Sequence, residues 1–276
     1  MEHGFPERDR LDAEAIRRAL EDHPWRDLVQ VLPVTDSTNN ALKLLAAGGA
    51  PEGTTLIAER QTAGRGRLDR RFDSPAGSGI YLSVLLRPAC PPAELMTLTA
   101  QAAAAVRRAV GEVCGVLPGI KWVNDLQLNG KKICGILTEL SFGAGGLVAS
   151  AVVGIGVNCN RAAEDFPAEL QGIAGSILSE TGRRVDRNRL AAAMLRELSS
   201  LPRLDWREEY RGACVNLGKR VRILSPGAAD CPEGVAEDVG PDAELLVRTD
   251  GGLLIAVAAG EVSLRDADAG QLTVDN

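Results

Sequence analysis

The sequence predicts an α+β fold, a mixed and mostly antiparallel sheet backed by helices, followed by a small β-barrel. In roughly the first 200 residues, aliphatic strand-like runs alternate with amphipathic or alanine-rich helical runs. After these, short strand-like runs are separated by Gly, Pro and Asp turns. A chain of 276 residues suits one large domain with a small appendage, which we place at residues 1–210 and 211–276.

The helices are predicted from apolar residues at helical spacing, with capping residues before them and glycine after several of them. We expect helices over residues 11–21, 39–47, 91–114 and 186–201, with a connector over 202–211. Strands are predicted from β-branched and aliphatic runs that end at turn residues. In the large domain we expect them over residues 27–34, 54–60, 79–87 and 147–157. In the appendage we expect them over residues 216–224, 234–239, 245–249, 253–258 and 261–264.

The sharpest local signal is the pair Asn129-Gly130 between two apolar, alternating runs, because this pair favours a two-residue hairpin turn. We expect the paired strands to cover residues 120–128 and 131–140, with Asp125 opposite Cys134. Asp125 and Lys132 should then share one face of the ribbon, and Trp122 and Asn124 the other.

Composition excludes several classes of protein. Thirty-seven acidic and thirty-one basic side chains leave a net charge of −6, so we expect no nucleic-acid partner. No apolar run reaches the roughly 20 residues of a membrane helix, and the amino terminus lacks a signal core, so we expect a cytoplasmic protein. Six cysteines without a CxxC pair, and only two histidines, favour reduced thiols and no protein-bound metal.

A basic segment interrupts this acidic background. Residues 59–71 contain five arginines and two glycines, which suit close backbone approach to a phosphate or carboxylate. A solvated loop is the simpler alternative. Lys132 could likewise form a structural ion pair with Asp125, or neutralise a carboxylate that attacks a phosphate. Gly154-Ile155-Gly156 begins like a dinucleotide fingerprint, but Cys159 replaces the third glycine, which leaves close backbone packing or a simple turn.

Taken in order, seven segments resemble the biotin protein ligases. They are Asp36–Asn39, Gln61–Arg67, Ser74-Pro75, Gly79–Ser83, Lys121–Leu126, Lys132–Leu137 and Gly154–Asn158. The likeness spans residues 30 to 200, and the tail is similar to that family's SH3-like barrel. The resemblance implies a class II aminoacyl-tRNA synthetase-like catalytic domain. Only one helix and one strand precede Asp36, so we expect the short form without an amino-terminal DNA-binding domain, and no repressor role.

The resemblance implies an ATP-dependent ligase that makes biotinyl-AMP and pyrophosphate. Biotin then passes to a lysine of a biotin carboxyl carrier protein, a subunit of acetyl-CoA carboxylase. Mg²⁺ would enter mainly on the ATP phosphates. Dimers are common in the family, so a homodimer is one option, although no residue pattern demands it.

Site residues follow from the resemblance position by position. Ser37, Thr38 and Gln61 are expected to bond the ureido ring of biotin, with Asn39 capping that wall. Lys132 is expected between the biotin carboxylate and the α-phosphate, and Asp125 beside the acceptor lysine. The catalytic set is Lys132, Arg67 and Asp125. The biotin-binding set is Ser37, Thr38, Asn39, Gln61, Gly64, Arg65, Gly66, Arg67, Lys132 and Gly135. The nucleotide-binding set is Arg65, Arg67, Phe72, Trp122, Asn124, Lys132 and Asn158.

Three departures from the family pattern are Val123 for proline, Asp69 for glycine and Phe72 for tryptophan. We expect them to weaken nucleotide contact without loss of function. One rival function is a lipoate or octanoate ligase of the same superfamily, which would not need the polar partners Thr38 and Gln61. The other is a biotin-sensing binding protein without turnover, which would not need Lys132 and Arg67 near a phosphate.

Overall fold

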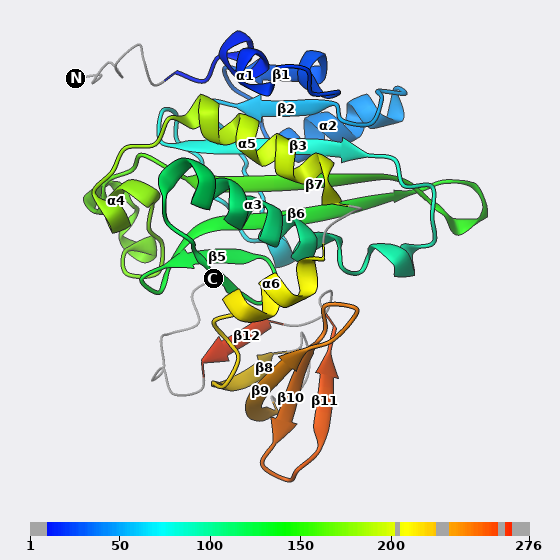
Figure 1. Ribbon diagram of the computed structural model, residues 1–276, viewed down its shortest axis with the longest axis vertical. Helices are drawn as coiled ribbons and strands as arrows, with labels where there is room; N and C mark the ends of the chain where they lie inside the picture. Colours follow the sequence, from blue (N-terminus) through cyan, green and yellow to red (C-terminus); the bar gives the residue numbers. More distant parts are fainter. Residues whose placement is uncertain (1–9, 202–204, 225–231, 259–262, 267–276) are drawn as a thin grey trace.

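A seven-stranded sheet forms the centre of the computed structural model, which describes residues 10–201, 205–224, 232–258 and 263–266. The strand order is β1-β2-β3-β7-β6-β5-β4 (Figure 1). Only β1 and β2 pair in parallel among these strands. The predicted mixed, mostly antiparallel sheet is therefore confirmed. Its strands are β1 (Val29–Leu32), β2 (Thr55–Ala58), β3 (Gly79–Leu86), β4 (Gly119–Lys121), β5 (Asp125–Leu128), β6 (Lys131–Phe142) and β7 (Val148–Asn158).

Helices cover both faces of this sheet. Helices α3 and α5 pack against each other and lie across one face, next to α1 (Figure 1). Helix α2 packs on β2, β3 and β7, through a second apolar cluster that includes Leu42 and Leu85. The described helices are α1 (Ala13–Leu20), α2 (Thr38–Ala47), α3 (Leu98–Cys114), α4 (Ile177–Thr181), α5 (Arg187–Ser199) and α6 (Trp206–Ala213). None of them is long and apolar enough to cross a membrane.

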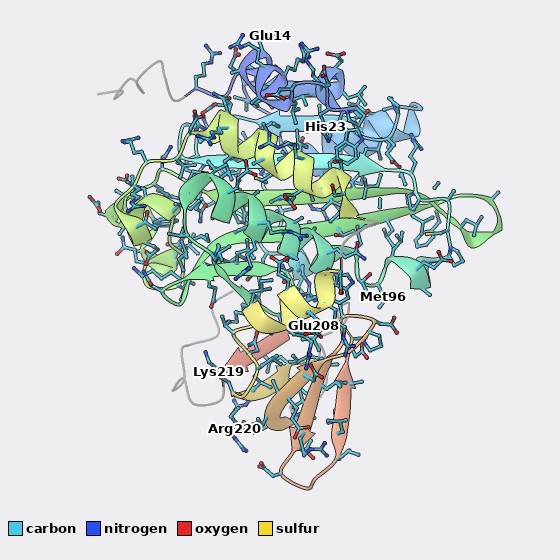
Figure 2. The ribbon with its side chains drawn as sticks, viewed as in Figure 1. Glu14, His23, Met96, Glu208, Lys219 and Arg220 are labelled. Carbon is cyan, nitrogen blue, oxygen red and sulfur yellow. The ribbon has the colours of Figure 1, made fainter. Side chains whose placement is uncertain are left out.

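A second, five-stranded sheet follows α6 in the order β11-β10-β9-β8-β12. Charged side chains such as Lys219 and Arg220 extend from it (Figure 2). It fits the small SH3-like domain expected at the end of the chain. Its strands are β8 (Arg220–Leu224), β9 (Glu233–Val239), β10 (Leu245–Thr249), β11 (Leu254–Val257) and β12 (Ser263–Asp266). Of the predicted strand over 261–264, the first two residues lie outside the described ranges.

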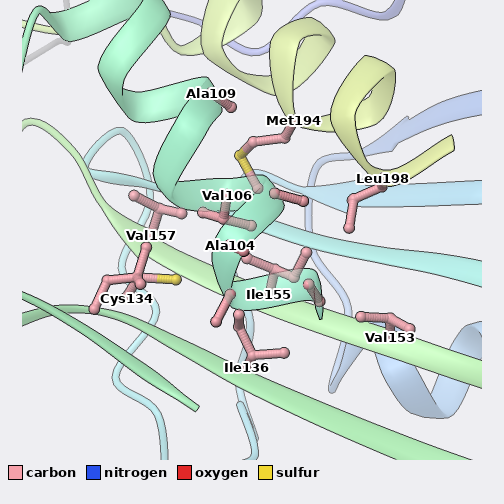
Figure 3. Close-up of a cluster of buried hydrophobic side chains, with 14 of the residues drawn as sticks. Ala104, Val106, Ala109, Cys134, Ile136, Val153, Ile155, Val157, Met194 and Leu198 are labelled. Atoms are coloured by element: carbon pink, nitrogen blue, oxygen red, sulfur yellow. The ribbon is translucent and has the colours of Figure 1, made fainter. Parts of the chain in front are cut away.

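The main core lies between α3, α5 and the sheet (Figure 3). Four consecutive alanines of α3, residues 102–105, are fully buried, so this helix approaches the strands closely. Met194 and Leu198 of α5 fill the space above Ile155 and Val153 of β7. This packing holds β6 and β7 rigidly, and these strands carry one wall of the site.

Four sequence-based expectations about the elements and their pairing were wrong. The strand predicted over 120–128 is two strands, with Lys121 of β4 opposite Asp125 of β5, so residues 122–124 form a turn. An irregularity after Leu126 shifts the hairpin register and places Asp125 opposite Gly135 instead of Cys134.

The predicted connector over 202–211 contains helix α6, which buries Trp206 and Tyr210 one turn apart. The long helix predicted from residue 91 begins at Leu98, because the prolines before it form a separate single turn over Pro92–Leu95.

Candidate active site

One cleft collects side chains from the start of α2, the arginine loop (residues 64–72), the hairpin β5–β6 and strand β7. Its lining residues are Ser37, Thr38, Asn39, Gln61, Arg65, Gly66, Arg67, Phe72, Asn124, Lys132, Gly135, Ile136, Leu137, Gly154, Ile155 and Gly156. Most of the predicted biotin-binding and nucleotide-binding residues are therefore brought together. Segments far apart in the chain meet here because β3, β7 and β6 are neighbours in the sheet.

The polar wall of the cleft is built around Gln61. The backbone nitrogen and the hydroxyl of Thr38 donate to Gln61 Oε1 at 2.9 and 3.1 Å, and Gln61 Nε2 donates to Ser74 Oγ at 3.0 Å. Ser37 precedes α2 but does not cap it with its side chain, which lines the cleft instead. This wall presents oriented polar groups to a neutral polar ligand.

Asn39 lies at the base of that wall and is fixed from two strands. Its Oδ1 lies 2.6 Å from the Ser83 hydroxyl of β3, and its Nδ2 donates to Glu139 Oε2 of β6 at 2.9 Å and to the Leu137 carbonyl at 3.3 Å. A side chain at Gly154 would collide with Asn39. The glycines of the 154–156 segment therefore serve close packing inside a strand, and the turn alternative was wrong.

The arginine loop folds back on itself over the cleft. The nitrogen of Gly66 donates to the Arg70 carbonyl at 2.7 Å, and the nitrogen of Phe72 donates to the Gly64 carbonyl at 2.9 Å. The Phe72 ring lies against the backbone of β7, where any side chain at Gly156 would collide with it. The loop can therefore pack on the backbone of β7 only because residue 156 is a glycine, which leaves room for the Phe72 ring.

Arg67 and Lys132 supply positive charge to the cleft. Arg67 donates to Asn124 Oδ1 at 3.2 Å, and Lys132 Nζ lies 2.8 Å from Asp125 Oδ1. Burial lowers the pKa of Arg67 from its ordinary value, and the Asp125 charge opposes that shift. The predicted placement of Asp125 and Lys132 on one face of the hairpin is confirmed, since the register shift still leaves the two side chains in contact. The cleft can therefore bind a ligand that has a negatively charged group at one end, beside the two cations, and an uncharged polar group at the other, beside the polar wall.

Asn124 reaches the cleft although the predicted ribbon placed it on the opposite face. The turn over residues 122–124 reverses the chain, and Asn124 Nδ2 donates to the Ile136 carbonyl at 3.1 Å. Its Oδ1 accepts from Arg67. The amide therefore links the hairpin to the arginine loop.

Two predicted nucleotide-binding residues lie outside the cleft lining. Trp122 is 5% exposed, and its indole nitrogen donates at 2.9 Å to the carbonyl of Ala243, in the loop between β9 and β10 of the small sheet. Asn158 is buried and donates to the Gly175 carbonyl at 3.0 Å. Gly64 and Asp125 adjoin the lining without being part of it, through the contacts described above. Trp122 faces the second sheet because the turn directs it away from β5.

Sequence reasoning missed Ser83 and Glu139, which hold Asn39 and do not line the cleft. Ser83 is fully buried on β3. Glu139 interrupts an apolar strand, and its carboxylate accepts from Lys43, Arg65 and Asn39. Glu139 could have been found from the sequence because it is a charged residue inside a predicted buried strand. Such a residue needs partners that neutralise it.

Comparisons with known proteins agree with this arrangement. The sequence pattern of the biotin/lipoate A/B protein ligase family matches residues 31–158. The pattern of the biotin protein ligase C terminal domain matches residues 217–265. These ranges coincide with the sheet that carries the cleft and with the small second sheet.

A relative and a solved structure that resemble this chain are named as biotin ligases, a narrower group than the biotin/lipoate family pattern covers. The biotin--[acetyl-CoA-carboxylase] ligase of Mycobacterium tuberculosis is 36% identical over 274 residues, covering 93% of this chain and 98% of that protein. The bifunctional ligase/repressor BirA of Bacillus spizizenii is 44% identical over 178 residues, covering 64% of this chain. The match covers 54% of the length of that Bacillus protein, so the chain spans about half of it.

Among solved structures, the biotin protein ligase of Aquifex aeolicus in complex with biotin and ATP superposes with a TM-score of 0.73 at 28% identity. This superposition covers 87% of this chain and 99% of the Aquifex chain. The chain belongs to the biotin protein ligase family.

Proposed function

We propose that the chain is a biotin protein ligase, which activates biotin with ATP and transfers it to a lysine of a biotin carboxyl carrier protein. One observation carries the proposal: a neutral polar wall and two cations open into the same cleft. The wall, Thr38 with Gln61, suits the ureido ring. Arg67 and Lys132 suit the carboxylate and the phosphates.

In the first step, a carboxylate oxygen of biotin attacks the α-phosphorus of ATP, and the bond to the departing pyrophosphate breaks. Both reactants are anionic, so they repel each other unless cations lie between them. We assign this role to Lys132 and Arg67, and the nucleotide side of the cleft to Asn124 and Phe72. Asn39 already uses both amide hydrogens within the protein, which supports a role as a brace of the biotin wall.

In the second step, the amine of the acceptor lysine attacks the carbonyl carbon of biotinyl-AMP, an amide bond forms, and AMP leaves. The amine must lose a proton to attack. Asp125 adjoins the cleft, 2.8 Å from Lys132, and we assign it to orienting the acceptor lysine or accepting that proton. The acceptor domain is inferred from the acetyl-CoA-carboxylase ligase names of the relatives.

Magnesium is the metal that ATP chemistry implies. Asp125, the carboxylate beside the cleft, is paired with Lys132, so we expect Mg²⁺ to be held mainly by the ATP phosphates. When bound, it would neutralise part of the phosphate charge.

Further parts of the proposal concern organisation and location. We propose a catalytic unit over residues 1–210 and an SH3-like unit over 211–276. The five described cysteines form no disulfide, a state suited to the cytoplasm, where we propose that the protein works. A homodimer stays a hypothesis, which light scattering of the purified chain would test.

The deciding experiment is isotope exchange between ATP and radiolabelled pyrophosphate in the presence of magnesium. We expect exchange with biotin, and little with lipoate or octanoate, because an aliphatic acid leaves Gln61 and Thr38 without ligand partners. Exchange that is faster with lipoate would favour the lipoate ligase alternative. Binding of biotin with no exchange would favour a sensing protein.

A further inference from the structure

Glu139 on strand β6 lies behind the cleft and joins two of its walls. Its Oε1 accepts from Lys43 Nζ at 2.8 Å and from Arg65 at 2.9 Å, and its Oε2 accepts from Asn39 Nδ2 at 2.9 Å. Asn39 and Lys43 belong to α2, whereas Arg65 belongs to the arginine loop. One carboxylate therefore connects the helix, the loop and the strand.

The contacts of Glu139 decide where two lining side chains can lie. Arg65 donates to Glu139 and to Asn40 Oδ1 at 3.2 Å, so its guanidinium is held against α2. Asn39 has both amide hydrogens engaged, one of them with Glu139. Without Glu139, neither side chain would keep its full set of partners.

The Glu139 carboxylate holds helix α2 and the arginine loop together because several hydrogen bonds meet on it. A single exposed ion pair contributes little to stability. Here the Glu139 side chain is only 19% exposed, and three charge-assisted hydrogen bonds meet on it. Removing the carboxylate would leave Lys43 and Arg65 as neighbouring cations that repel each other, so the loop would move away from α2.

We propose that Glu139 is a positioning residue that holds the arginine loop against helix α2 and thereby controls how long biotin stays bound. The inference rests on the proposed function, which supplies biotin as the ligand. It assigns Glu139 no contact with biotin. Its effect passes through Arg65 and Asn39.

The first test needs no ligand. Trypsin cleaves after arginine, and the arginine loop contains Arg65, Arg67, Arg70 and Arg71. We expect Glu139→Ala to accelerate cleavage within the loop about tenfold, because cleavage follows the open population. Glu237→Ala is the matched control, since it removes a carboxylate paired with Arg248 on the small sheet. Equal loop cleavage in both variants would overturn the proposal even if the protein does not bind biotin.

The second test measures biotin itself. After the unmodified protein has been shown to bind biotin, we expect Glu139→Ala to raise the biotin dissociation rate and the KM for biotin in pyrophosphate exchange about tenfold, with kcat changed less than about threefold. Glu139→Gln keeps an acceptor for one cation and should fall between Ala and the unmodified protein. An unchanged dissociation rate in both variants, or an equal fall in kcat without a change in KM, would refute the positioning role. If the alanine variant does not fold, the glutamine variant decides.

Discussion

Lys132 is the residue that we propose lies between the two anionic substrates. Its ammonium lines the cleft beside Asp125, while its backbone nitrogen donates to the Ile173 carbonyl at 2.8 Å. The backbone is thus anchored and the charged end remains available to a ligand. This combination makes Lys132 the first residue to test for chemistry.

We predict that Lys132→Ala lowers biotinyl-AMP formation by at least about a hundredfold while the fold is kept, because the ammonium acts where negative charge approaches the phosphate. Pyrophosphate exchange measures the rate, and circular dichroism checks the fold. The matched control is Lys131→Ala, whose ammonium lies 3.3 Å from Glu180 instead. Exchange at the unmodified rate in Lys132→Ala would disprove the assignment.

Asp125 allows the two steps to be separated. We predict that Asp125→Asn slows transfer to the carrier lysine more than it slows biotinyl-AMP formation, because the amide cannot take the proton of the acceptor amine. Single-turnover transfer from preformed biotinyl-AMP can be compared with exchange in the same preparation. Equal losses in both assays would show that Asp125 acts only through its ion pair with Lys132.

Pairing across one hairpin was predictable, whereas contacts between distant strands were not. The Asn129-Gly130 turn predicted that Asp125 and Lys132 share one face of the hairpin, and they are in contact although the register shift places Asp125 opposite Gly135. Ser83 and Glu139 reach Asn39 only because β3, β7 and β6 are adjacent, and no local pattern encodes that order. Trp122 lay outside the expected cleft because a turn replaced the predicted strand.

His23, which is labelled in Figure 2, joins the segment that follows helix α1 to the end of α5. Its Nε2 lies 2.8 Å from Ser199 Oγ, and its Nδ1 accepts from the Trp25 nitrogen at 3.2 Å. An accepting Nδ1 requires the neutral ring. Burial, with the nearby Arg196 charge, lowers the pKa of His23 from its ordinary value of 6.5.

This shift predicts the direction of a pH effect. Between the lowered pKa and 6.5 the unfolded chain binds a proton that the folded protein does not, so stability falls as pH decreases below 6.5. We expect the free energy of unfolding of the unmodified protein, measured with urea, to fall as the pH is lowered from 8 to about 5.5. We expect a smaller fall in His23→Gln. The same pH dependence in both proteins would assign the effect to other groups.

Helix α6 and the residues just before β8 support the turn that carries Asn124. Asn216, just before β8, is 1% exposed and accepts from the Trp122 nitrogen at 2.7 Å. The Tyr210 hydroxyl of α6 donates to the Val123 carbonyl at 3.1 Å. The turn is therefore held by α6 and by the residues that lead into the second sheet, and the two parts of the chain should respond together to a change at this junction.

We predict that Asn216→Ala lowers the free energy of unfolding by about 1–3 kcal/mol, because it leaves a buried backbone N–H without its acceptor. The same variant should raise the KM for ATP, since Asn124 shares the turn. Asn188→Ala serves as the control, because its carbonyl also accepts from a backbone nitrogen, that of Asp12, but at an exposed position. Urea denaturation and exchange kinetics at varied ATP give both values. Unaltered KM for ATP would mean that the junction stabilises the fold without shaping the cleft.

The bond between the Trp122 indole and the Ala243 carbonyl has a spectroscopic consequence. Trp122 is the first residue of the turn that leads to the cleft, yet its ring is buried against the loop between β9 and β10. Its fluorescence would therefore report the separation of the two sheets from each other. An emission change at Trp122 on adding substrate would be a signal of motion between the parts, rather than of a ligand stacked on the ring.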